Sequence, residues 1–154
     1  MVKENLGTNI VTNVVTQIAI VVEDIDKAAE AYSRIFGLPK PEVRVTDPEV
    51  AQAMYRGEPT HDRAKLAFLD MGQVSIELIE PVGENSVWYE VLEEKGEGVH
   101  HIAFQIKGTD EVTDYLESEG MPVIQQGRYT GGMYTYVDSE SELGVMLELL
   151  ENFE

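Results

Sequence analysis

The stretch Gly98-Val99-His100-His101-Ile102-Ala103-Phe104 places two adjacent histidines where a glycine turn gives way to an apolar run. The run predicts a strand, and neighbouring side chains of a strand point to opposite faces. We therefore expect at most one of the two histidines to face any given cavity. A histidine at the mouth of a strand serves either as a metal ligand or as an ordinary polar residue at the strand end. The rest of the chain decides between these two roles.

The stretch belongs to an internal repeat. The strand opening Gln17-Ile18-Ala19-Ile20 matches His101-Ile102-Ala103-Phe104, and the strand ending at residues 74–80 matches residues 145–151. Apolar periodicity and glycine stops predict the order β-α-β-β-β in each half. We therefore expect four units: an N-terminal arm (residues 1–12), a first βαβββ module (13–82), a linker helix (83–98) and a second βαβββ module (99–154).

The sequence also predicts the loops, turns and short strands that connect these elements. Residues 58–63, which carry His61, are predicted to form a loop, as are residues 129–133 with their glycines. A short strand is expected over residues 123–125, and a turn over residues 139–144. A hairpin joins the strands predicted at residues 65–69 and 74–80.

Composition narrows the possible functions. The chain has 154 residues, a formal net charge of −18 and no cysteine. Such a negative surface repels nucleic acids and anionic membranes, so neither is expected as a partner. The lack of cysteine excludes disulfides, thiolate metal sites and a cysteine nucleophile. No signal-peptide core is visible, and the longest apolar run, residues 18–22, is too short to span a bilayer, so we expect a cytoplasmic protein.

Glu77 and Glu148 hold the same position in the two halves, each in the middle of an apolar strand. A buried carboxylate is unfavourable unless it is paired or coordinated, although strand alternation also allows both to face solvent. If the halves pack as related units, Glu77 and Glu148 can converge with Gln17 and His101. One imidazole nitrogen and three oxygens suit a divalent cation such as Mn, Fe, Co, Ni or Zn. Such a cation could stabilise an enolate formed by proton removal next to a carbonyl.

These motifs, together with Ala67-Phe68-Leu69 and the run from Gly144 to Leu149, resemble the vicinal oxygen chelate superfamily, which has the glyoxalase/bleomycin resistance fold. Within it, the chain looks most like the methylmalonyl-CoA epimerases. The resemblance implies an α+β fold in which paired βαβββ modules form a curved mixed sheet around a metal cleft. It also implies a homodimer and a divalent metal ion (Co, Ni, Mn or Zn). It assigns the metal ligands to Gln17, Glu77, His101 and Glu148, and it selects His101 rather than His100.

The residues depart from the epimerase pattern in two places. Epimerases usually have His at the position of Gln17 and Gln at that of Glu77, whereas the set found here resembles that of some glyoxalase I enzymes. Epimerases also carry a catalytic Glu on the third strand of the first half, and Lys65 aligns with that position. Glyoxalase I, in turn, has an arginine where this chain has Val21.

We therefore expect a metal-dependent isomerase or lyase that is epimerase-like and abstracts a proton next to a carbonyl. By analogy with glyoxalase I, Glu148 is the expected metal-bound base. The expected substrate is an acyl-CoA or a small 2-oxo or dicarboxylic compound. The alternatives are a lactoylglutathione lyase (glyoxalase I)-like enzyme and a non-catalytic small-molecule-binding member of the fold.

Overall fold

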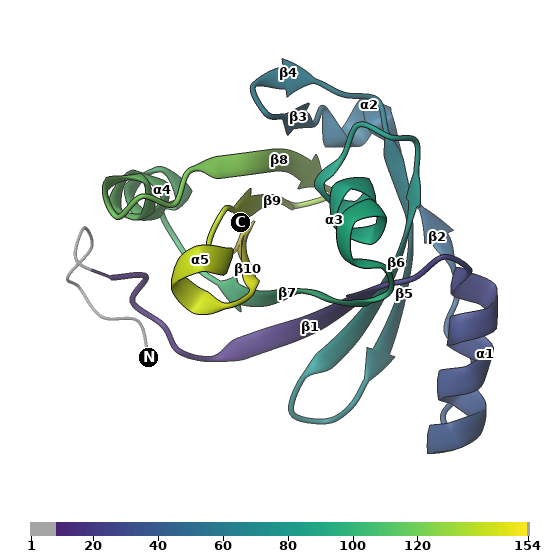
Figure 1. Cartoon of the computed structure of the whole chain (residues 1–154). Helices are drawn as coiled ribbons and strands as arrows, with labels where there is room; N and C mark the ends of the chain where they lie inside the picture. The colour runs from purple at the N-terminus through teal and green to yellow at the C-terminus, as the bar shows by residue number, and fades with distance from the viewer. Residues whose placement is uncertain (1–8, 154) are drawn as a thin grey trace.

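One curled, ten-stranded mixed sheet dominates the computed structural model (Figure 1), which describes residues 9–153. Residues 1–8 of the expected N-terminal arm lie outside the described residues. The strands are β1 (Val15–Val21), β2 (Arg44–Val45), β3 (Met54–Tyr55), β4 (Glu58–Pro59), β5 (Arg63–Asp70), β6 (Ser75–Val82), β7 (Gly98–Gln105), β8 (Val123–Tyr129), β9 (Gly132–Val137) and β10 (Met146–Asn152).

The strand order reproduces the sequence repeat. The order across the sheet is β2-β5-β6-β1-β7-β10-β9-β8-β3-β4. At its centre β1 and β7 pair antiparallel; β1 then pairs parallel with β6, and β7 pairs parallel with β10. Antiparallel partners follow on both sides, β5 beside β6 and β9 beside β10. The predicted α+β class and curved mixed sheet are confirmed, whereas the exact boundaries of the four units stay a prediction.

Helices cover both faces of the curled sheet. The helices are α1 (Ile25–Phe36), α2 (Pro48–Ala51), α3 (Val87–Lys95), α4 (Thr109–Ser118) and α5 (Glu140–Leu143). The first helix, α1, begins after Asp24, whose carboxylate accepts from the Lys27 N–H, and ends at Gly37 in the left-handed conformation. The helix α1 packs on the outer face of the first half, and α4 packs on the outer face of the second. In contrast, α3 lies inside the curve, where Trp88 and Val91 join the inner core (Figure 1).

Three predicted connections are more regular than expected. The turn predicted at residues 139–144 contains the short helix α5, and β8 continues to Tyr129 rather than ending at residue 125. The loop expected at residues 58–63 begins with β4, which pairs with β3 as a small hairpin. Strand β3 in turn pairs with β8, so a segment of the first half joins the sheet of the second. Two-residue strands are too short to show any periodicity in the sequence.

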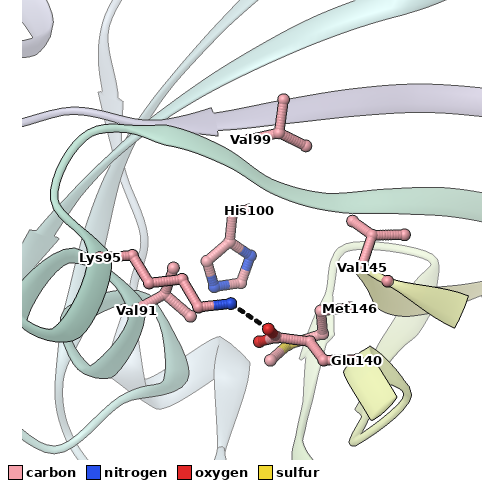
Figure 2. Close-up of a pocket in the computed structure, with 8 residues that line it drawn as sticks. Val91, Lys95, Val99, His100, Glu140, Val145 and Met146 are labelled. Carbon is pink, nitrogen blue, oxygen red and sulfur yellow. Dashed lines mark hydrogen bonds and ion pairs between the residues drawn. The ribbon is translucent and has the colours of Figure 1, made fainter. Parts of the chain in front are cut away.

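A cavity of about 220 Å³ lies between α3, α5 and the adjoining ends of β7 and β10 (Figure 2). Val91, Val99 and Met146 contribute apolar walls, and an ion pair between Lys95 and Glu140 joins the two helices beside it. No helix within residues 9–153 is long and apolar enough to cross a membrane.

Candidate metal centre

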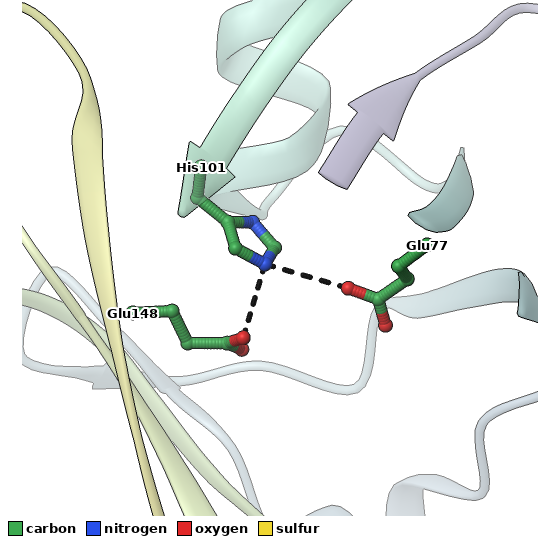
Figure 3. A group of neighbouring side chains, drawn as sticks. All are labelled: Glu77, His101 and Glu148. Carbon is green, nitrogen blue, oxygen red and sulfur yellow. Dashed lines mark ion pairs between the residues drawn. The ribbon is translucent and has the colours of Figure 1, made fainter. Parts of the chain in front are cut away.

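Three of the four predicted ligands meet on the inner face of the sheet (Figure 3). His101 extends from β7, and its Nε2 lies 3.0 Å from Glu148 Oε1 on β10 and 3.4 Å from Glu77 Oε1 on β6. The three residues are 0%, 4% and 7% exposed, respectively. The alternative that both carboxylates face solvent is therefore wrong.

Strand register explains why these side chains converge. Ala19 of β1 lies opposite both Glu77 and His101, whereas Ala103 of β7 lies opposite both Gln17 and Glu148. The two alanines are fully buried and occupy equivalent positions in the two halves. Because an alanine side chain is a single methyl group, it leaves room for the longer neighbouring side chains to meet above it.

The fourth predicted ligand, Gln17, lies on β1 opposite Ala103, which on its other side lies opposite Glu148. Within residues 9–153, four buried side-chain nitrogen or oxygen atoms lack a hydrogen-bond partner of proper geometry. Leaving such a buried polar atom unsatisfied costs about 1–3 kcal/mol. Each of the four can offer a lone pair to a cation. The four atoms are Gln17 Oε1, Glu77 Oε1, His101 Nε2 and Glu148 Oε1.

The electrostatics of the cluster favour a positive charge at its centre. Burial alone would lower the pKa of His101, but the carboxylates of Glu148 and Glu77 outweigh this effect and raise the pKa to about 9. Burial raises the pKa of the Glu77 carboxyl, and the charge of Glu148 raises it further, although His101 opposes both. A proton on His101 Nε2 therefore occupies the place that a metal ion would take.

The rings of His100 and His101 lie on the same side of β7, so strict alternation of faces fails at this pair, although neither the cavity of Figure 2 nor the metal cluster includes both histidines. The β1–β7 register shifts at this point: Ala19 lies opposite His101 and Ile20 opposite Val99, so His100 has no partner on β1. Such a bulge changes the direction in which the side chain of the extra residue points. His100 is 2% exposed, and its Nδ1 lies 2.9 Å from His101 Nδ1. Burial lowers the pKa of His100 to about 3, so its ring is neutral. The cavity of Figure 2 contacts His100 and none of the four predicted ligands.

Aromatic residues of β9 form one wall of the centre. Tyr136 lies opposite Glu148 in the β9–β10 register, and its ring stands edge-on to His101 at 5.0 Å. Its hydroxyl accepts a hydrogen bond from Trp88 Nε1 at 3.0 Å. Tyr134 accepts from Gln125 Nε2, and burial raises its pKa to about 12. The sequence-based prediction of site residues missed these two tyrosines. Their spacing of two residues places both on the same face of the strand that pairs with the Glu148 strand, and this pattern could have identified them.

Lys65 does not face the predicted centre. Its Nζ lies 3.3 Å from Glu80 Oε2, and the other Glu80 oxygen accepts from the Ile25 N–H at the start of α1. Lys65 therefore lies on the outer face of β5, where it balances a helix-capping carboxylate. The inner face of β5 presents Ala64 and Leu66 to the core around Trp88, and Phe68 lies opposite Glu77.

Comparison with known proteins places this fold in a family. Residues 16–137 match the model of the Glyoxalase/Bleomycin resistance protein/Dioxygenase superfamily. The chain belongs to this superfamily. The match spans residues of both repeats, from β1 to β9.

Similarity to individual proteins is more distant. The chain is 28% identical over 143 residues to the uncharacterized protein YqjC of Bacillus subtilis, covering 90% of this chain and 92% of that one. It is 29% identical over 111 residues to an ethylmalonyl-CoA/methylmalonyl-CoA epimerase of Cereibacter sphaeroides, covering 71% and 73% of the two chains. A crystal structure of methylmalonyl-CoA epimerase from Mycobacterium tuberculosis superposes with a TM-score of 0.66 at 23% identity, covering 96% and 92%. At that identity the superposition supports the fold alone.

Proposed function

We propose that this protein is a divalent-metal-dependent isomerase that removes a proton next to a carbonyl, as an acyl-CoA epimerase does. The observation that carries the proposal is the set of four buried atoms that lack a well-formed hydrogen bond, on Gln17, Glu77, His101 and Glu148. These residues would hold the ion, which we expect to be Co, Ni, Mn or Zn. When bound, such an ion supplies Lewis acidity that stabilises negative charge on a carbonyl oxygen.

The proton is handled by the buried carboxylates. We assign its removal to Glu148, whose Oε1 lies in the centre of the cluster. Epimerisation also requires delivery of a proton to the opposite side of the carbon. Glu77 is suited to this step, because it contacts His101 from the other half of the repeat and burial raises the pKa of its carboxyl. Lys65 takes no part, since it pairs with Glu80 on the outer face.

An acyl-CoA with a carboxylate on its α-carbon is the proposed substrate class. Support comes from the relative in Cereibacter sphaeroides, which acts on ethylmalonyl-CoA and methylmalonyl-CoA by name. The glyoxalase I-like alternative has one specific observation in its favour. The residue of β5 that lies opposite Glu77 is Phe68, and Lys65 pairs with Glu80 on the outer face, so the proton-handling groups proposed here come from the metal-binding set itself.

The test is metal-dependent exchange of the substrate α-proton. The chelator-treated protein is reconstituted separately with Co, Ni, Mn and Zn, and the bound metal is measured by elemental analysis. Each form is then incubated in D₂O with methylmalonyl-CoA, and deuterium at the α-carbon is followed by mass spectrometry. A parallel assay uses the adduct of methylglyoxal and glutathione. We expect one bound ion per chain, and deuterium incorporation that is lost on chelation.

Matched variants separate the outcomes. Glu148→Gln keeps the shape of the side chain and removes its basicity, whereas Glu117→Gln makes the same change on the exposed face of α4. Exchange lost in the first variant and kept in the second supports the assignment. Turnover of the glutathione adduct alone would favour the glyoxalase-like alternative. Failure to bind any of the four metals would refute both enzymes and leave a non-catalytic binding protein. The homodimer stays a prediction, which light scattering can check.

A further inference from the structure

A chain of hydrogen bonds leads from His101 away from the two carboxylates, and the proposed function makes no use of it. The Nδ1 of His101 lies 2.9 Å from the Nδ1 of His100. On the far side of the His100 ring, Nε2 lies 3.3 Å from the carbonyl oxygen of Val87. All three residues are buried, with exposed fractions of 2% or less, so water does not compete for these contacts.

The position of each proton follows from what each atom can do. A carbonyl oxygen only accepts, so the contact with Val87 places a proton on Nε2 of His100. A neutral imidazole carries one proton, and Nδ1 of His100 is therefore an acceptor. The proton between the two rings then belongs to Nδ1 of His101. The remaining nitrogen of His101, Nε2, is the one that faces Glu77 and Glu148.

We propose that His100 is a positioning residue: by accepting from His101 Nδ1, it fixes the tautomer and ring orientation in which Nε2 of His101 binds the metal ion. The inference rests on the proposed metal centre and adds a residue to it. Partners of this kind behind a metal-binding histidine typically change metal affinity by about 10–100-fold when removed. The β7 bulge makes the contact possible, because regular alternation would place His100 on the other face.

The far end of the chain of hydrogen bonds is also fixed. Val87 is the first residue of α3, and its N–H donates to Gln125 Oε1 at 2.8 Å. Gln125 is 1% exposed and donates in turn to the Tyr134 hydroxyl. The carbonyl that orients His100 is therefore held by buried contacts to β8 and β9. His100 also touches the Tyr136 ring, so a packing role must be separated from the proposed one.

Histidine side-chain ¹⁵N NMR of the metal-free protein tests the proton positions directly. We expect His100 to carry its proton on Nε2 with Nδ1 unprotonated, and His101 to be protonated at Nδ1. We also expect a coupling between the two Nδ1 atoms across the hydrogen bond. A proton on His100 Nδ1 would overturn the proposal.

Two substitutions at His100 distinguish its role as a hydrogen-bond acceptor from its role in packing. In His100→Asn the side-chain oxygen can take the place of Nδ1 as acceptor, whereas His100→Phe keeps a ring against Tyr136 and accepts nothing. We expect zinc affinity, measured by calorimetry, to fall about 10–100-fold in the Phe variant and to stay within about threefold of wild type in the Asn variant. Equal zinc affinity in wild type and a folded Phe variant would contradict the proposal.

The same data distinguish failure of the inference from failure of the proposed function. If the wild-type protein binds no divalent ion but shows the expected ¹⁵N pattern, the proposed function is wrong and the proton arrangement of the two histidines stands. If the wild-type protein binds zinc and both variants bind it equally well, the metal centre stands and His100 has no positioning role.

Discussion

Raising the pH from about 6.5 to about 8.5 should strengthen divalent-metal binding about a hundredfold, because the ion must displace a proton from His101. Burial lowers the pKa of His101, but Glu148 and Glu77 outweigh this and raise it from 6.5 to about 9. Throughout this pH range the ring of the metal-free protein is therefore protonated. Each pH unit then contributes about a tenfold gain in apparent affinity, or about 1.4 kcal/mol, for the one proton released.

The same proton makes the stability of the metal-free protein depend on pH. The pKa of His101 in the folded protein lies above its ordinary value, so the stabilisation is fully present below pH 6.5. It is lost as the pH rises through about 9. The melting temperature of the metal-free protein should therefore fall over this range, and the increase caused by bound metal should grow with pH.

Isothermal titration with Mn²⁺ at half-unit pH steps, in non-coordinating buffers, measures the effect. His61→Gln, which changes an exposed histidine, should keep the same slope, whereas His101→Gln should remove it. A histidine with an ordinary pKa would give an affinity that levels off above pH 6.5. A plateau between about pH 7 and pH 8.5 would therefore refute the idea that the facing carboxylates hold the proton on His101.

Three further changes test other parts of the structure. Glu148→Gln should lower α-proton exchange about 10²–10⁴-fold, as measured by deuterium incorporation, and it should also lower the melting temperature of the metal-free protein, because His101 loses the carboxylate that raises its pKa. Ala103→Val adds two methyl groups to a fully buried position between Gln17 and Glu148, so it should cost about 1–3 kcal/mol in the free energy of unfolding and weaken metal binding. Lys65→Gln should leave exchange unchanged and cost less than about 1 kcal/mol in urea unfolding, because Lys65 forms a half-exposed ion pair on the outer face; a large loss of exchange would contradict this placement.

The candidate ligands could be predicted from the sequence because each ligand position occurs once in each half of the internal repeat. Glu77 and Glu148 each interrupt an apolar strand at the same place, which a single copy would leave open to a solvent-facing interpretation. The structure buries both. Gln17 and His101 likewise share a position, although their side chains differ in chemistry.

Features that change when the pairing of two strands shifts by a single residue could not be predicted in the same way. The bulge at His100 leaves no mark in the sequence, yet it turns both histidines toward the inner face. Lys65 shows the same sensitivity, because a shift of one residue along β5 exchanges the inner and outer faces. Pairing between β3 and β8 joins two-residue segments far apart in the chain, and no local pattern announces it.

That pairing has a consequence for how the chain folds. Met54 of β3 pairs with Gln126 of β8, and β1 pairs with β7 across a similar length of chain. When only the first repeat has been synthesised, β1 and β3 of the nascent chain therefore each have one unpaired edge. Pairings over such sequence separations form slowly, and unpaired strand edges promote aggregation meanwhile. The first repeat should therefore reach its native state only after most of the second has been synthesised, and the two repeats should fold as one cooperative unit.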